Sequence, residues 1–136
     1  MYAPVLLGAE VVLNRTLLQS LENRPAVYEF SRIEGVEQYP AGCSATCYIG
    51  SSIQFCKRMQ HYLGGRAQTN SLRCAIHNGV MVRWRYIEHC RVAEAKMIHS
   101  FIRHYGERPR HNRVTPALPD ETCSRTAIQG GPKITV

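Results

Sequence analysis

The segment from Tyr48 to Arg58 carries two side chains that suit the chemistry of phosphate esters. Tyr48-Ile49-Gly50 has the composition of a short strand ended by a glycine, and Arg58 follows that glycine by eight residues in a predicted basic helix. The planar guanidinium of arginine matches phosphate oxygens and stays charged at any relevant pH. A lone arginine on a helix is usually a surface residue, so these residues predict a site only in combination with others.

A second tyrosine and a carboxylate stand where they could join these two residues. Tyr28 lies on a predicted strand next to that of Tyr48, so the two hydroxyls could converge at one edge of a small sheet. Tyrosines in strands more commonly pack with only their tips in water. Glu94 precedes Met97 and Ile98 by three and four residues, so it shares the apolar stripe of a helix. A carboxylate there is desolvated or holds a cation, unless it only interacts with the helix dipole.

The hydrophobic pattern that must position these residues predicts an α+β fold, with a small three-stranded antiparallel sheet flanked by helices. Apolar residues recur every three to four positions in predicted helices at residues 11–22, 53–63, 71–77 and 92–105. Predicted strands lie at residues 26–30, 46–49 and 80–87, with a loop at 31–44. The pattern assigns residues 1–114 to one domain and residues 115–136, rich in proline and glycine, to an extended or partly ordered extension.

Bulk composition favours a polyanionic partner and a reducing compartment. The 136 residues carry a formal net charge of +7, which suits nucleic acid, although a solvated basic surface gives the same value. Six cysteines without a secretion signal predict reduced thiols in a cytoplasmic protein, and Cys43-x3-Cys47 is a weak zinc signal. No stretch has the length and apolarity of a membrane span.

The order and spacing of these features resemble the GIY-YIG nuclease domain, most closely that at the N-terminus of the excision-repair subunit UvrC. The family's two tyrosine motifs match Pro25-Ala26-Val27-Tyr28-Glu29-Phe30 and Tyr48-Ile49-Gly50. Its arginine and the tyrosine or histidine that follows match Arg58 and Tyr62, the latter preceded by His61. Its glutamate motif and closing motif match Glu94-Ala95-Lys96-Met97-Ile98 and Pro109-Arg110-His111-Asn112.

Three departures from the family pattern accompany this resemblance, which covers residues 13–114. Ala26 replaces the glycine of the first motif, a small change unless the strand needs a positive φ. The interval from Tyr28 to Tyr48 is about twice the usual one, which indicates an insertion. The interval from Glu94 to Asn112 is also longer than in the excision-repair subunit.

The resemblance implies a metal-dependent endonuclease that hydrolyses DNA phosphodiester bonds in repair, restriction, phage or mobile-element biology. Glu94 would hold one divalent cation, Mg²⁺ or Mn²⁺, since a single carboxylate with waters and substrate oxygens suits Mg²⁺. Arg58 would clamp the scissile phosphate, and Tyr48 or Tyr28 would act as the general base. A base tyrosine, whose ordinary pKa is about 10, needs a nearby cation to lower that pKa.

Further roles follow from the same resemblance. Tyr62 or His61 would assist proton movement, and Asn112 would brace the site. The implied partner is duplex or branched DNA, at the nucleoid of a bacterium or in the host cytoplasm for a phage protein. The basic residues expected to contact its phosphates are Lys57, Arg83, Arg85, Arg103, Arg108, Arg110 and Arg113.

Two other kinds of protein remain compatible with the sequence. One is a catalytically inactive nucleic-acid-binding module, and the other is a subunit of a larger nuclease complex. The presence of both Arg58 and Glu94 favours an active enzyme, because a retired site has no need of a metal ligand in an apolar stripe. The oligomeric state is left open by the sequence.

Overall fold

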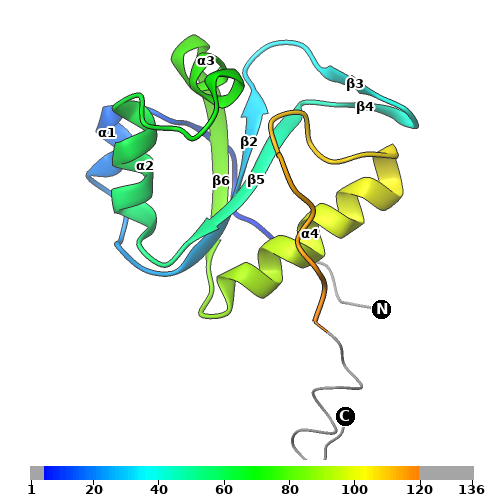
Figure 1. Ribbon diagram of the computed structural model, residues 1–136. Coiled ribbons are helices and arrows are strands. Elements are labelled where there is room, and N and C mark those ends of the chain that lie inside the picture. Colours follow the sequence, from blue (N-terminus) through cyan, green and yellow to red (C-terminus); the bar gives the residue numbers. More distant parts are fainter. Residues whose placement is uncertain (1–4, 120–136) are drawn as a thin grey trace, which may run out of the picture.

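A four-stranded antiparallel sheet forms the centre of the computed structural model, which describes residues 5–119 (Figure 1). Its strands run in the order β1-β6-β2-β5. Their bounds are Val11–Val12 for β1, Ala26–Arg32 for β2, Thr46–Ser52 for β5 and Val80–Tyr86 for β6. The α+β class is confirmed, and β2, β5 and β6 are the three expected strands.

The expectation of a three-stranded sheet is wrong by one strand, because residues 11 and 12 extend the sheet instead of opening a helix. Val11 lies opposite Val82, and the Leu13 amide donates to the Val80 carbonyl at 3.0 Å. The helix expected at residues 11–22 shortens to α1 (Arg15–Leu18), whose first turn is capped by the side chain of Asn14. Two valines beside a run of leucines fit both the two-residue period of a strand and the 3.6-residue period of a helix. Only the pairing with β6 shows that residues 11 and 12 form a strand.

Helices cover both faces of the sheet (Figure 1). On one face lie α1, α2 (Phe55–Leu63) and α3 (Asn70–Asn78), and on the other lies α4 (Cys90–Tyr105). Successive residues of a strand point to opposite faces, so Tyr28 and Phe30 enter the larger core beneath α2 while Ile49 packs against α4. The expected helices at 53–63, 71–77 and 92–105 are therefore confirmed to within about two residues at each end.

The long connection between β2 and β5 forms a second, two-stranded sheet, which the sequence pattern did not predict. Its strands are β3 (Glu37–Tyr39) and β4 (Gly42–Ser44). The ring of Tyr39 packs against Phe101 and Tyr105 of α4, with ring centroids 5.0 and 5.8 Å apart. This hairpin contributes to the core beneath α4, so the insertion is part of the folded domain.

The alanine that replaces the family's glycine lies in regular strand. Ala26 pairs with Ser52 on one side and Tyr86 on the other, and its side chain is fully buried. Its methyl group therefore fills core space without disturbing the sheet.

Residues 115–119 contain neither helix nor strand, and most of the predicted extension at 115–136 lies outside the described residues.

The five cysteines within the described residues are free thiols, and Cys123 lies beyond them. No helix in residues 5–119 has the length and apolarity needed to cross a membrane.

Candidate active site

A cavity of about 380 Å³ opens at the edge of the sheet formed by β5. Because β5 is an edge strand, side chains from its two faces and from both helical layers can meet around it. Six of the seven predicted catalytic residues line the cavity: Tyr48, Arg58, His61, Tyr62, Glu94 and Asn112. They come from β5, α2, α4 and the segment that follows α4.

The seventh residue, Tyr28, lies beneath this cavity and is fully buried. Its hydroxyl shares a 2.6 Å hydrogen bond with that of Tyr62, and the rings of Tyr28 and Tyr48 are 6.3 Å apart. The sequence offered either tyrosine as the general base. Only Tyr48 lines the cavity, so only its hydroxyl is accessible to a substrate bound there.

Burial keeps both of these tyrosines protonated in the isolated protein. Desolvation raises the pKa of Tyr48, the neighbouring Tyr62 and Glu94 raise it further, and only Arg58 lowers it. The pKa of Tyr28 is raised for the same leading reason. One arginine is thus too little to make Tyr48 a base, and additional positive charge at the cavity is needed.

Arg58 is held among phenol groups. Burial alone would lower its pKa, but the interaction with Tyr28 and hydrogen bonding with Tyr62 outweigh that effect and raise the pKa. Within residues 5–119 the guanidinium forms no ion pair with a carboxylate. Its charge is therefore oriented by neutral hydroxyls and remains available to an anion in the cavity.

Gly50 allows the tyrosine cluster to form. A Cβ atom at this position would lie 2.6 Å from the Tyr28 hydroxyl oxygen and 2.8 Å from Cε2 of Tyr48. Both contacts are far inside van der Waals range, so the glycine of the Tyr-Ile-Gly motif is a steric requirement of the two rings.

We expect Gly50→Ala to lower the free energy of unfolding by about 1–3 kcal/mol, because the new methyl group overpacks a filled core. Urea denaturation followed by circular dichroism measures this loss. Gly64→Ala is the matched control, since a Cβ there meets its nearest atom, the Gln60 carbonyl oxygen, at 3.4 Å. Equal unfolding midpoints for Gly50→Ala and the wild type would contradict the steric role.

Glu94 reaches the cavity from the opposite face of the sheet. The Ser51 hydroxyl donates a hydrogen bond to Oε1 of Glu94. Burial raises the pKa of the carboxyl group, while Ser51, Arg91 and Arg58 oppose the shift only in part. As the apolar stripe predicted, Ile98 is fully buried on the same helix, while Glu94 lies half-buried at the cavity.

The donor chemistry at Glu94 fits a single hard cation. No cluster of three or more histidine, cysteine or acidic side chains that could hold a metal occurs in residues 5–119. A half-buried carboxylate with a raised pKa gains from a cation, and Mg²⁺ is commonly bound by one or two carboxylates with waters and phosphate oxygens. Glu94 is therefore the residue that would hold the predicted ion.

Asn112 fastens the segment after α4 to the free edge of β5. Its amide accepts a hydrogen bond from the Ile49 backbone amide at 3.0 Å and donates one to the Ile49 carbonyl at 2.8 Å. The His111 amide also donates to the Cys47 carbonyl at 2.9 Å. These contacts satisfy the exposed strand edge and occupy both polar atoms of the Asn112 amide.

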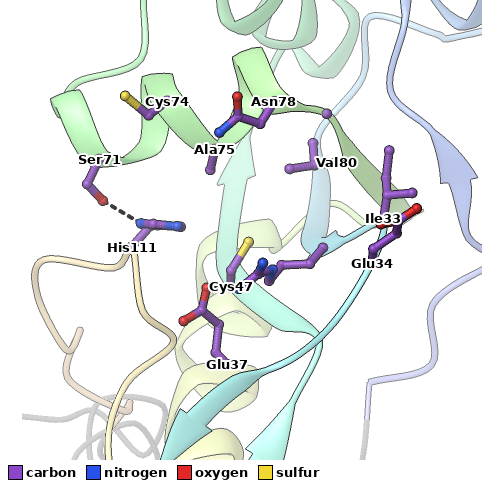
Figure 2. Close-up of a pocket in the computed structure, with 12 residues that line it drawn as sticks. Ile33, Glu34, Glu37, Cys47, Ser71, Cys74, Ala75, Asn78, Val80 and His111 are labelled. Carbon is purple, nitrogen blue, oxygen red and sulfur yellow. Dashed lines mark hydrogen bonds and ion pairs between the residues drawn. The ribbon is translucent and has the colours of Figure 1, made fainter.

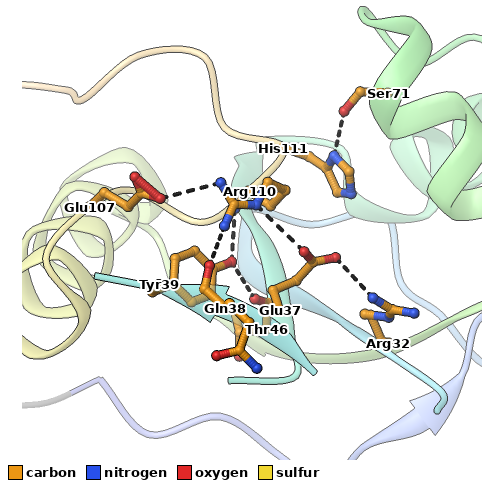
Figure 3. Close-up of polar contacts among 9 residues, drawn as sticks. All are labelled: Arg32, Glu37, Gln38, Tyr39, Thr46, Ser71, Glu107, Arg110 and His111. Carbon is orange, nitrogen blue, oxygen red and sulfur yellow. Dashed lines mark hydrogen bonds and ion pairs between the residues drawn. The ribbon is translucent and has the colours of Figure 1, made fainter. Parts of the chain in front are cut away.

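The inserted hairpin holds the same segment from the other side (Figure 3). The Tyr39 hydroxyl donates to the Thr46 carbonyl and accepts from the Arg110 backbone amide, each at 2.9 Å. The Arg110 guanidinium forms ion pairs with Glu37 and Glu107 at 3.5 and 3.2 Å and lies over the Tyr39 ring. Arg110, expected to contact nucleic acid, is thus engaged by the protein itself.

The other basic residues expected to bind nucleic acid are dispersed. Arg83 is paired with Glu29 at 3.2 Å, and Arg83 and Arg85 lie on β6, which β2 separates from β5. Lys57 is exposed on α2 but does not line the cavity, whereas Arg113 does.

Arg66 and His111 are cavity residues with ionisable side chains to which the sequence gave no role. Arg66 follows the two glycines that end α2, and His111 lies inside the closing motif between two residues that did receive roles. Arg66 lies in the connection between α2 and α3, where no periodic pattern indicates the direction of a side chain. The contacts of His111 with Cys47 and with Ser71 of α3 are long-range, so no local pattern indicated them.

Comparisons with protein-family models, curated proteins and solved structures found no match. The resemblance to the GIY-YIG domain therefore stays a prediction carried by the motif residues and by their arrangement around the cavity.

Proposed function

We propose that this chain is a metal-dependent endonuclease of GIY-YIG type that hydrolyses DNA phosphodiester bonds. The observation that carries the proposal is the meeting of Tyr48, Arg58 and Glu94, from three separate elements, around one cavity. A proton acceptor, a fixed cation and a carboxylate that fits a metal ion are the groups that phosphodiester hydrolysis requires.

The charge of the cavity supports an anionic substrate. Arg58, Arg66 and Arg113 line it together with one carboxylate, that of Glu94. None of these three arginines forms an ion pair within the described part of the chain. A concave surface lined by uncompensated positive charge concentrates phosphate esters and speeds their association.

The chain's own groups fall into distinct roles during hydrolysis. The Arg58 guanidinium binds non-bridging oxygens of the scissile phosphate and stabilises the negative charge that develops there. Tyr48 positions the attacking water, and its phenolate, formed after its own proton is lost to solvent, accepts the proton of that water. Tyr62 or His61 carries a proton toward the leaving oxygen. Asn112 holds the segment after α4 against β5, which keeps the wall of the cavity in place.

Glu94 is the residue that would hold the divalent cation. A bound divalent ion would supply the positive charge that Tyr48 needs to act as a base and would neutralise charge on the phosphate. Ser51 fixes the carboxylate through its hydrogen bond to Oε1, so the second oxygen can face the cavity.

Cleavage of supercoiled plasmid DNA and of a branched DNA substrate tests the proposed function. We expect cleavage in Mg²⁺, none with excess EDTA, and full recovery when Mg²⁺ exceeds the chelator. Gel electrophoresis of end-labelled products measures the cut and its position. Binding without cleavage under every metal condition would instead support the non-catalytic nucleic-acid-binding module, and cleavage only with an added partner would support a subunit of a larger nuclease.

A further inference from the structure

A second and larger cavity, of about 600 Å³, lies beside the candidate active site (Figure 2). It is open to solvent on one side and lies between α3, the last residue of β2, the beginnings of β5 and β6, and the segment that leads into β3. His111 lines both cavities. A substrate held at Arg58 and Tyr48 could therefore extend past His111 into the second cavity.

The charges of the second cavity do not suit a phosphate. Glu34 and Glu37 line it with one arginine, Arg32, which is already paired with Glu37 at 3.3 Å. Glu34 has no ion pair within residues 5–119. The first cavity thus carries uncompensated arginines, while the second carries an excess carboxylate, and a polynucleotide backbone would favour the first.

The remaining lining is suited to a flat, neutral, hydrogen-bonding group. Ile33, Ala75 and Val80 form an apolar part of the wall. The side-chain amide of Asn78, at the end of α3, lines the cavity without a hydrogen-bond partner in the described part of the chain. Together with Glu34 it offers both donor and acceptor atoms beside an apolar surface, as a heterocyclic base requires.

His111 lines both cavities, and its side chain lies beside Ser71 of α3 (Figure 2). Its ring nitrogen Nδ1 is hydrogen-bonded to the Ser71 hydroxyl, and its backbone amide is bonded to Cys47. Burial lowers the pKa of the imidazole, so the ring is mostly neutral at pH 7. A neutral, held imidazole is a surface on which a nucleobase can stack.

We propose that the second cavity binds the base of a nucleotide next to the scissile phosphate, turned out of the base stack. This inference rests on the proposed nuclease function and names its substrate class, DNA with an unpaired nucleotide beside the cut. The cost of unpairing is smallest when that nucleotide already lies in a bulge, flap or fork. Such substrates are therefore cut faster than a perfect duplex of the same sequence.

A scan of abasic sites tests the proposal, because it removes one base while keeping every phosphate. The substrates are end-labelled forked DNAs, each with one abasic nucleotide at a different position around the mapped cut. We expect one position at which loss of the base lowers kcat/KM about tenfold or more. Flanking positions, whose bases do not enter the cavity, should show little change.

Two variants connect that effect to the cavity. Ala75→Phe fills it, and Asn78→Ala removes the unpartnered amide at an exposed position. In both variants we expect the ratio of kcat/KM between the intact and the abasic substrate to fall toward one. His77→Ala is the matched control, since His77 is exposed on the same helix and lines neither cavity, and it should keep the wild-type ratio.

The possible failures can be told apart. Cleavage that shows no sensitive position, or a ratio unchanged in both variants, overturns the base-binding site and leaves the nuclease function standing. Failure of the wild type to cleave any of the substrates in Mg²⁺ overturns both.

Discussion

Glu94→Ala is expected to abolish DNA cleavage while leaving DNA binding nearly unchanged. The substitution removes the carboxylate that suits a metal ion, and loss of several kcal/mol of transition-state stabilisation lowers kcat on the order of 10³-fold or more. Binding is expected to persist because phosphate contacts from arginines dominate affinity, and removing a carboxylate from an arginine-lined cavity does not weaken them. Plasmid cleavage and fluorescence anisotropy with labelled DNA measure the two effects separately.

Two control variants separate lost chemistry from lost structure. Glu94→Gln keeps the volume of the side chain and an oxygen that can accept the Ser51 hydrogen bond, so it should fold normally and still fail to cleave. Glu88→Ala removes an exposed carboxylate just before α4 and should cleave like the wild type. Mg²⁺-dependent cleavage retained by Glu94→Ala would refute the assignment of the metal site.

Arg58→Ala is expected to lower kcat/KM by about 10²–10³-fold, the usual effect of removing one group that stabilises developing negative charge. It also changes the pH dependence. Arg58 lowers the pKa of Tyr48, so its removal raises that pKa further above the ordinary value. The rate increase that accompanies deprotonation of Tyr48 therefore moves to higher pH in the variant. Initial rates measured from pH 6 to pH 10 show both effects.

Arg58→Lys is a graded control, because it keeps the positive charge but loses the planar fork of the guanidinium. Its pH profile should therefore lie close to that of the wild type, while its rate stays below the wild-type rate. Arg15→Ala removes an exposed arginine from α1, away from the cavity, and should leave kcat and the pH profile unchanged. A pH profile unchanged in Arg58→Ala would argue against Tyr48 as the base.

Local patterns in the sequence determined most of the elements of the fold, including those that carry the candidate site. The alternation of Val80, Val82 and Trp84 predicted β6, and the apolar stripe through Met97 and Ile98 predicted α4. These periodicities come from the geometry of a single strand or helix, so they can be read without knowing what the element packs against. The motif spacings then named six residues that the folded chain does bring to one cavity.

Other features depended on contacts between distant parts of the chain. The strand at residues 11 and 12 exists through its pairing with β6, and the hairpin at Tyr39 is held by α4 and by the backbone of Arg110. The same packing brings Glu37 to Arg110, and a count of charges along the sequence does not reveal this ion pair.

The sequence by itself therefore determined the local elements and the residue types that suit phosphodiester chemistry. The tertiary structure alone decided which of them meet. It placed Tyr48 at the cavity and Tyr28 beneath it, joined Arg66 and His111 to the site, and set Arg83 and Arg85 apart from it. The physical reason is that an edge strand with helices on both faces of its sheet gathers side chains through long-range packing, which one-dimensional spacing does not encode.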